Sequence, residues 1–336
     1  MRNMARLVAR EDLESLLSAI ARRVTEPRAG VFGPGSMMWK ISRESALFLG
    51  SGRAALLQLA HPWVAAAIAE HSMVLGDPIA RFHNTFRIVF TLIFGSLDQA
   101  FAAARHLHTL HTGIRGELPH AVGQWERGAN YAANEVAALL WVYATLIEGA
   151  VLAYRSVLPL GEGEREQYYQ ESRTLAALFG IPPAALPDNW QAFEDYVSAM
   201  IDSAELGVSA AARSMGENIL RGVGSWIHPP HWYGALTAEW MPPRFRQEFG
   251  LTPDARAANR ARVWLPRLYR RVPAALRFLG PYREAEARLR SRGPDLLTQA
   301  GNRFWIGQRQ MPFGNAPHMQ HEAGVSHPTR SPETGT

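Results

Sequence analysis

The stretch Asn134-Glu-Val-Ala-Ala-Leu-Leu-Trp-Val-Tyr-Ala-Thr-Leu-Ile-Glu-Gly-Ala-Val-Leu-Ala-Tyr-Arg-Ser-Val157 decides the fold of this chain. Asn134 and Glu135 supply the polar start of a helix, and Leu158-Pro159 stops it. Between them the residues are apolar on almost every side of a helical projection. Such a helix is buried, whereas a surface helix keeps one polar face. The stretch therefore predicts a long central helix that other helices surround.

Helix start signals recur on both sides of this stretch. Asp77-Pro78 is typical of an N-cap and first helical residue, and Ser96 caps the next helix. We expect these two helices to run to about Phe94 and to near Gly116. Further starts lie at Gly163-Glu164, Asp188-Asn189, Ser209 and Thr252-Pro253. Because alternating apolar and polar residues are nearly absent, the sequence predicts an all-α fold, with a single multi-helix, bundle-like domain.

The alanine-rich residues 53–70 form a second apolar stretch, which His61-Pro62 interrupts. Proline inside a helix removes one backbone hydrogen bond and clashes with the carbonyl four residues earlier, here that of Gln58. We expect Pro62 to kink one continuous buried helix. His61 is expected to be structural and to bond to backbone groups that the kink leaves unpaired.

Composition limits the cellular setting and the ligand chemistry. The chain has 336 residues, of which 47% are hydrophobic, and no cysteine, so disulfides and thiolate ligands are excluded. A metal would have to bind through nitrogen and oxygen donors. No wholly apolar run reaches the roughly 18 residues of a membrane-spanning helix. The first residues lack the apolar centre of a secretory signal, so we expect a cytoplasmic protein.

The basic charge is concentrated near the C-terminus. Residues 241–293 hold thirteen arginines and four acidic residues. A solvated helical face is the plainest explanation, and peripheral contact with an anionic membrane is the sharper one. Without a recognition motif, nucleic acid is not expected as a partner.

The same patterns divide the chain into four parts. Residues 1–41 are expected to form an N-terminal helix and lead-in, residues 42–250 the main helical domain, and residues 251–309 arginine-rich helices. The remainder, 310–336, is rich in Pro, Gly, Ser, Thr and His, and is expected to be disordered.

Seven of the twelve histidines lie between positions 61 and 120. His108 and His111 are three residues apart and share a helical face, whereas His106 points away from it. This spacing without a nearby carboxylate is a weak metal signal. A hydrogen-bonded structural histidine is the competing interpretation for each.

A second polar group comes from the helix after Asp77. Arg81, Asn84 and Thr85 lie at i, i+3 and i+4 and project from one face. A guanidinium, an amide and a hydroxyl on one face suit the polar wall of an apolar pocket. The alternative is a structural tie to a neighbouring helix.

Several short motifs together resemble one catalytic domain. In chain order they are His61-Pro62, Glu70-His71-Ser72, Asp77-Pro78, Arg81-xxx-Thr85, His111-xx-Ile-Arg-Gly116, Tyr131-Ala132 and Leu140-Trp-Val-Tyr-Ala-Thr-Leu146. This domain is shared by the latex-clearing rubber oxygenases and the membrane-bound MpaB oxygenase that shortens a farnesyl chain in mycophenolic acid synthesis. The resemblance covers about residues 42 to 250.

The resemblance implies an all-α domain around a buried haem b pocket. His111 matches the histidine that ligates the haem iron, and Arg81 and Thr85 match positions near the haem. Trp141 and Tyr143 fall in a matching motif and are expected at the cofactor. Two residues depart from the family: Asn84 replaces the lysine of the rubber enzymes, and Tyr143 stands where many members carry histidine.

The leading hypothesis is a haem b-dependent oxygenase that uses O₂ on an apolar, isoprenoid- or lipid-like substrate. Arg81, Asn84 and Thr85 would polarise oxygen, and Glu70 would be the base beside a double bond. A haem or apolar-ligand binding protein without turnover is the first alternative. A non-haem metalloenzyme that uses His108, His111 and Glu70 is the second.

Overall fold

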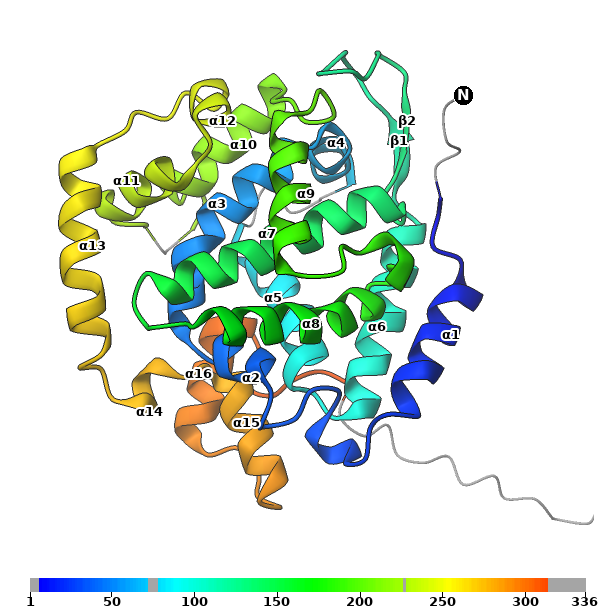
Figure 1. Ribbon diagram of the computed structural model, residues 1–336, viewed down its shortest axis with the longest axis vertical. Helices are drawn as coiled ribbons and strands as arrows, with labels where there is room; N and C mark the ends of the chain where they lie inside the picture. Colours follow the sequence, from blue (N-terminus) through cyan, green and yellow to red (C-terminus); the bar gives the residue numbers. More distant parts are fainter. Residues whose placement is uncertain (1–5, 72–77, 226–227, 314–336) are drawn as a thin grey trace, which may run out of the picture.

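The structure is a computed structural model that describes residues 6–71, 78–225 and 228–313. Helices dominate it (Figure 1). The α-helices are α1 Arg10–Ala21, α2 Met37–Ser42, α3 Phe48–Leu59, α4 Pro62–His71, α5 Pro78–Phe94, α6 Leu97–Thr112, α7 Val136–Arg155, α8 Glu162–Leu178, α9 Trp190–Asp202, α10 Ala210–Arg221, α11 His231–Trp240, α12 Pro243–Glu248, α13 Ala255–Tyr269, α14 Ala274–Arg277, α15 Gly280–Leu289 and α16 Leu296–Ile306. The described residues also include the short 3-10 helices η1 Pro27–Ala29, η2 Ser45–Leu47 and η4 Pro183–Ala185. The all-α prediction is confirmed.

One small sheet accompanies the helices. Strands β1 Arg115–Glu117 and β2 Asn130–Ala132 pair antiparallel, with Gly116 opposite Tyr131. The sequence did not predict this hairpin, because three-residue strands are too short to show an alternating pattern.

The central helix is α7, which crosses the middle of Figure 1. It starts after Glu135, as predicted, and packs against α2, α3 and α8. Glycines allow the approach to α3, because a Cβ atom on Gly50 would overlap the carbonyl oxygen of Gly149. Among the described residues, α7 is the one helix long and apolar enough to cross a membrane, with a mean hydropathy of 1.9. Because 67% of that apolar window is buried inside the protein, its apolar surface is covered by neighbouring helices.

The expected kink at Pro62 is a full break. Helix α3 ends at Leu59 and α4 begins at Pro62, so two helices replace the continuous one. The proline needs no backbone donor at the first position of α4, which explains why it starts a helix there. His61 lies between them, is 2% exposed, and accepts a hydrogen bond at Nδ1 from the Trp63 backbone N–H at 3.3 Å. The structural role predicted for His61 is therefore confirmed.

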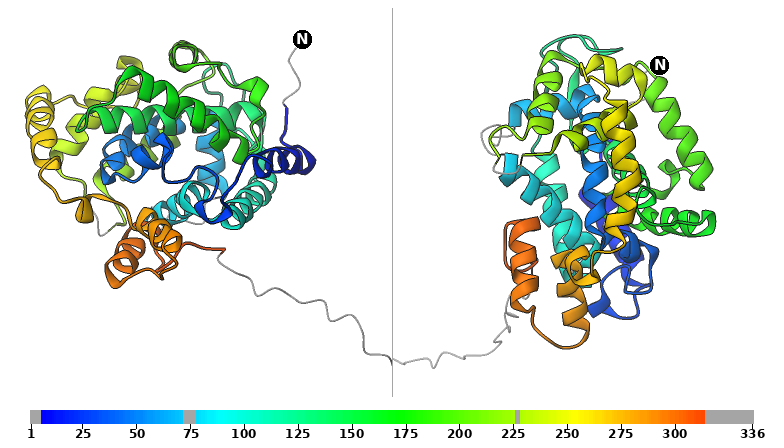
Figure 2. Two further views of the ribbon diagram at one scale, coloured as in Figure 1. Left: turned by 60° about the horizontal axis from the view of Figure 1, so that its bottom comes forward. Right: turned by 90° about the vertical axis from the view of Figure 1, so that its left-hand side faces the viewer.

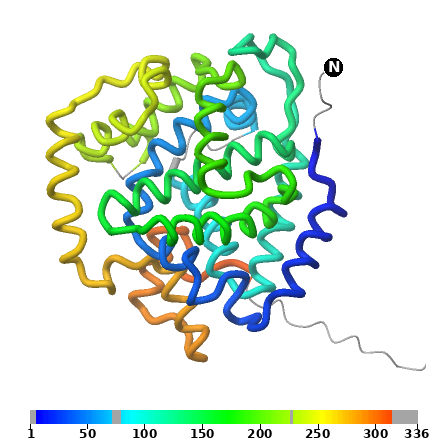
Figure 3. The backbone as a smooth tube through the Cα atoms, in the orientation of Figure 1, coloured from blue at the N-terminus to red at the C-terminus, as the bar shows by residue number. Residues whose placement is uncertain are grey.

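The C-terminal helices lie around the outside of this core. Helix α13 packs on α11, and α15 and α16 pack on each other and on α5. Figures 2 and 3 show α13 along one side and α15 and α16 at one end of the molecule. Of the tail expected to be disordered, residues 314–336 lie outside the described residues.

Candidate functional site

Helices α5 and α6 form a tight hairpin whose open end carries the main candidate residues. Gly95 and Ser96 join the helices, and Ser96 caps α6 by accepting from the Gln99 backbone N–H. The two helices pack against each other. Because both rise by the same amount per residue from the shared turn, Arg81 and His111 lie at the same end of the hairpin.

His111 lies on the inward stripe of α6. It follows Ala100, Ala104 and Leu107 at helical spacing, and this stripe faces the neighbouring helices. The imidazole makes no hydrogen bond within the described part of the chain. Burial, and secondarily the charge of His108, lower the pKa of His111 to about 4. The ring is therefore neutral at physiological pH, with a nitrogen lone pair that no described residue uses.

The neighbouring histidines have protein partners or lie in the open. His108 shares a hydrogen bond with the backbone carbonyl of Val8 at 3.0 Å between Nε2 and O. His106 is exposed and touches the ring of Phe313, so it points away from the stripe as predicted. Of the three histidines on α6, only His111 is both directed inward and unbonded.

Arg81 is a half-buried cation without a partner. Its guanidinium makes no hydrogen bond or ion pair among the described residues, and burial lowers the pKa of Arg81. Arg81, Thr85, Ile88 and Leu92 form one stripe along α5, and Leu92 is fully buried. Thr85 and Asn84 remain exposed. Arg81 and Thr85 therefore share one helix face, on which no described residue pairs with the cation, and the role of this face as the wall of a pocket stays a prediction.

Glu70, at the end of α4, is held by a tyrosine. The Tyr131 hydroxyl donates to Glu70 Oε2 at 2.6 Å, and Tyr131 is 3% exposed. Burial first, and the Glu70 carboxylate second, raise the pKa of Tyr131, so the phenol keeps its proton. A Cβ atom at Gly116 would lie 2.6 Å from Tyr131 Oη and 2.7 Å from Glu70 Oε2. A glycine at position 116 is thus required for the Glu70–Tyr131 pair to fit against strands β1 and β2.

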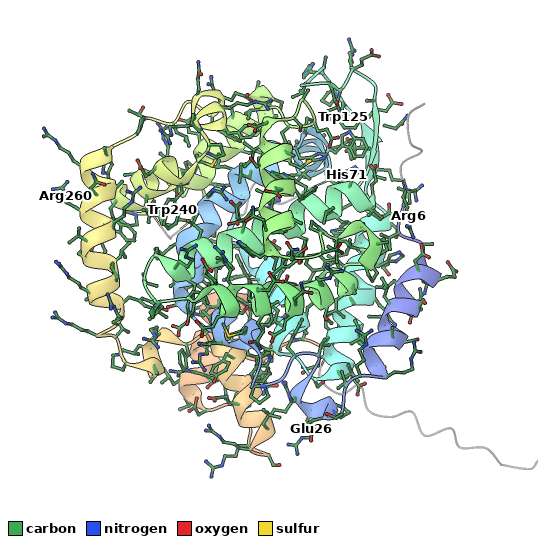
Figure 4. All side chains as sticks on the ribbon, in the orientation of Figure 1. Arg6, Glu26, His71, Trp125, Trp240 and Arg260 are labelled. Carbon is green, nitrogen blue, oxygen red and sulfur yellow. The ribbon has the colours of Figure 1, made fainter. Side chains whose placement is uncertain are left out.

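The Glu70–Tyr131 pair was not predicted, although its residues belong to the motifs quoted above. His71 adds a second link between the same elements, because its Nε2 lies 3.0 Å from the backbone carbonyl oxygen of Arg115. His71 and Trp125 are labelled in the upper right of Figure 4, beside α4 and the strands. Together these contacts attach the end of α4 to the strand that follows His111.

Trp141 and Tyr143 lie elsewhere, in the core around α7. The Trp141 Nε1–H donates to the Leu57 carbonyl at 2.8 Å, and Tyr143 Oη bonds to Ser172 Oγ at 2.6 Å. Both side chains are fully buried. Their polar atoms bond to α3 and α8, and contact of either ring with a cofactor stays a prediction.

The metal site expected from His108, His111 and Glu70 does not form. No group of three His, Cys, Asp or Glu side chains that could hold a metal exists among residues 6–71, 78–225 and 228–313. His108 bonds to Val8 and Glu70 to Tyr131 instead. Among the described residues, His108, His111 and Glu70 therefore do not come together as the three-ligand group that the non-haem alternative names.

Comparison with known proteins gives one family match. No curated protein and no solved structure matches the chain. The family model described as ER-bound oxygenase mpaB/B'/rubber oxygenase, catalytic domain, matches residues 39–278. The match extends past the expected boundary at residue 250 and includes α13. The chain therefore belongs to the family of oxygenase catalytic domains that mpaB/B' and the rubber oxygenases share.

Proposed function

We propose that this chain is a haem b-dependent oxygenase acting with O₂ on an apolar, isoprenoid- or lipid-like substrate. The observation that carries the proposal is the state of His111: an inward, neutral imidazole with no hydrogen-bond partner among the described residues. His111 is half-buried, and an unused polar group that is withdrawn from water costs stability, which favours a ligand as the reason for its presence.

The residues at the open end of the α5–α6 hairpin fit haem. Neutral imidazole is a common axial ligand of haem iron. The unpaired Arg81 guanidinium suits an anionic group such as a haem propionate. The imidazole of His111 comes from α6 and the guanidinium of Arg81 from α5. The two side chains would therefore hold two different parts of one ligand.

The haem iron would supply the oxygen chemistry, and the protein would bind, orient and exchange protons. His111 would hold the iron from α6. Thr85 and Asn84 offer a hydroxyl and an amide as hydrogen-bond donors beside Arg81. Glu70 would accept a proton from a carbon next to a substrate double bond, and Tyr131 would keep that carboxylate in place by its hydrogen bond to Oε2.

The first experiment measures haem retention by the Soret band of the purified full chain. Wild type should bind haem, and His111→Ala should lose it because the axial nitrogen is removed. His106→Ala is the matched control, an exposed histidine of the same helix that should retain haem. Equal occupancy in wild type and His111→Ala would remove the assignment.

A second experiment tests the polar face on α5. Arg81→Ala should keep most of its haem, since the axial bond comes from α6, and should lose turnover roughly ten- to hundredfold. Asn84→Lys should shift the haem spectrum by placing a cation near the iron. Unchanged turnover in Arg81→Ala, or an unchanged spectrum in Asn84→Lys, would make this face a structural tie.

A haem-binding protein without turnover is the alternative, and the neutral Asn84 in place of the lysine of the rubber enzymes favours it. Product analysis after supplying O₂ and candidate isoprenoids separates the two. Oxygenated or cleaved products that depend on haem support the oxygenase. A Soret band without product from any apolar candidate supports the binding protein.

A further inference from the structure

Helices α13 to α16 carry an exposed surface on which arginines alternate with large apolar side chains. We define this C-terminal surface by residues that are exposed to solvent: Arg256, Arg260, Val263, Arg267, Leu268, Arg271, Leu276, Leu296 and Leu297. On α13, Arg256, Arg260, Val263 and Arg267 recur every three or four residues and form one stripe, and Arg271 follows just after the helix. The opposite stripe holds Ala257, Ala258, Ala261 and Leu265, which are buried.

The arginines of this surface are not part of the protein's ion-pair network. The guanidinium groups of Arg256, Arg267 and Arg271 have no hydrogen bond or ion pair among the described residues. By contrast, Arg262 on the same helix pairs with Glu239 at 2.7 Å. Figure 4 shows Arg260 projecting from α13 away from the body of the molecule. Apart from the charge of Asp254 near Arg260, the stripe is therefore a positive surface without ion pairs to the described residues.

The leucines are among the most exposed apolar side chains that the structure describes. Leu276 is 67% exposed, Leu296 is 83% exposed and Leu268 is 54% exposed. Leu268 lies at the end of α13, Leu276 on α14 and Leu296 at the start of α16, and these elements follow the left-hand and lower left side of the molecule in Figure 1. These apolar side chains are exposed to water and are not buried against any other described element, which is typical of an interaction surface.

We propose that the C-terminal surface docks on an anionic lipid bilayer. Arginines would contact lipid phosphates, and the leucines would enter the boundary between headgroups and acyl chains. Nucleic acid would use the arginines and leave the leucines unexplained, so the combination favours lipid. The proposal does not depend on haem binding or on turnover, and it would place an enzyme for apolar substrates where such molecules concentrate.

The test is sedimentation of the full chain with vesicles of equal parts phosphatidylcholine and phosphatidylglycerol, and with vesicles of phosphatidylcholine alone. Binding should require the anionic lipid and weaken as salt is raised. The variant Arg267→Gln/Arg271→Gln should lower the partition constant about fivefold for each arginine. The variant Leu276→Ser/Leu296→Ser should lower it about tenfold or more, and this loss should persist at high salt.

The matched controls change the same residue types on other faces. Arg22→Gln/Arg23→Gln after α1 and Leu110→Ser on α6, where the leucine is 46% exposed, should bind as wild type does. Circular dichroism checks that each variant keeps its helices. Absence of binding to anionic vesicles, or equal loss in the controls, would overturn the proposal. Dimerisation that Leu276→Ser/Leu296→Ser abolishes, or binding to RNA unaffected by the leucine changes, would assign the surface to another partner.

Discussion

The α3–α7 core and the open end of the α5–α6 hairpin use the same residue types in opposite ways. In the core, Arg53 is 5% exposed, binds both carboxylate oxygens of Glu148 and donates to the Trp240 carbonyl at 2.9 Å. At the hairpin, Arg81 is half-buried and has no such partner. Each guanidinium loses hydration, but only Arg53 is compensated within the described protein.

The histidines repeat this contrast. Burial lowers the pKa of His61 and of His111 to about 4. His61 accepts the Trp63 backbone N–H, whereas the ring of His111 bonds to no described residue. Burial alone therefore does not mark a functional residue. Burial without a protein partner marks a candidate functional residue, because no hydrogen bond within the protein offsets the cost of desolvation.

The largest expected effect follows from the two arginines. Arg53→Ala leaves the partly buried Glu148 carboxylate unpaired, and should lower the free energy of unfolding by about 3–5 kcal/mol. Arg81→Ala breaks no hydrogen bond or ion pair with the described residues, and should change the free energy of unfolding by less than about 1 kcal/mol. Urea unfolding of the haem-free proteins measures both. Similar losses in the two variants would show that Arg81 has a structural partner.

A buried carboxyl group gives the next prediction. Glu135 is 8% exposed, and burial, followed by the charge of Glu205, raises its pKa to about 7. Because the pKa is raised, the stabilising contribution of the protonated form is complete below about pH 4.5 and is lost as pH rises to 7. Glu135→Gln should therefore gain stability relative to wild type at pH 8, on the order of 1–3 kcal/mol.

The check is urea unfolding between pH 5 and 8, with Glu148→Gln as the control. Glu148 is paired with Arg53, so its replacement should destabilise at neutral pH where Glu135→Gln stabilises. If the difference in the free energy of unfolding between wild type and Glu135→Gln stays constant over this pH range, Glu135 is ionised throughout.

Gly116 gives a smaller effect. In Gly116→Ala the new methyl group overlaps Glu70 Oε2 and Tyr131 Oη, so the Glu70–Tyr131 pair must move or the β1–β2 strands must shift. Overpacking of this kind typically costs about 1–3 kcal/mol, and turnover should fall as Glu70 is displaced. Gly113→Ala, where a Cβ atom meets nothing closer than 3.5 Å, is the control. Equal stability and activity in the two variants would contradict the tight fit.

Local sequence signals accounted for most of the helices. The caps at Ser96, Asn189 and Ser209 accept backbone N–H groups as predicted, because capping depends on residues only three apart. The break before Pro62 was predicted only as a kink. A proline signal locates the interruption, but whether the chain resumes in line depends on packing against elements distant in sequence.

The site was less predictable for the same reason. Helical periodicity placed Arg81 with Thr85 on one face and turned His106 away from His111. Periodicity could not show that His108 bonds to the Val8 carbonyl, or that the Tyr131 hydroxyl bonds to Glu70. These hydrogen bonds join residues far apart in the chain. Trp141 and Tyr143 share a motif, yet their two-residue separation on α7 directs them toward α3 and α8.

The smallest expected effect is a substitution that raises the free energy of unfolding, whereas most substitutions of inward-facing residues lower it. His111→Leu removes an unpaired polar ring and adds apolar contact on the inward stripe of α6. It should therefore raise the free energy of unfolding of the haem-free protein by about 1 kcal/mol while abolishing haem binding. His61→Leu is the matched control: it leaves the Trp63 N–H unpaired and should lower the free energy of unfolding by about 1–3 kcal/mol. Urea unfolding without haem, followed by haem titration, separates the two histidines. If His111→Leu is destabilised as much as His61→Leu, the His111 ring supports the fold itself, and the contrast between core and hairpin no longer identifies an iron ligand.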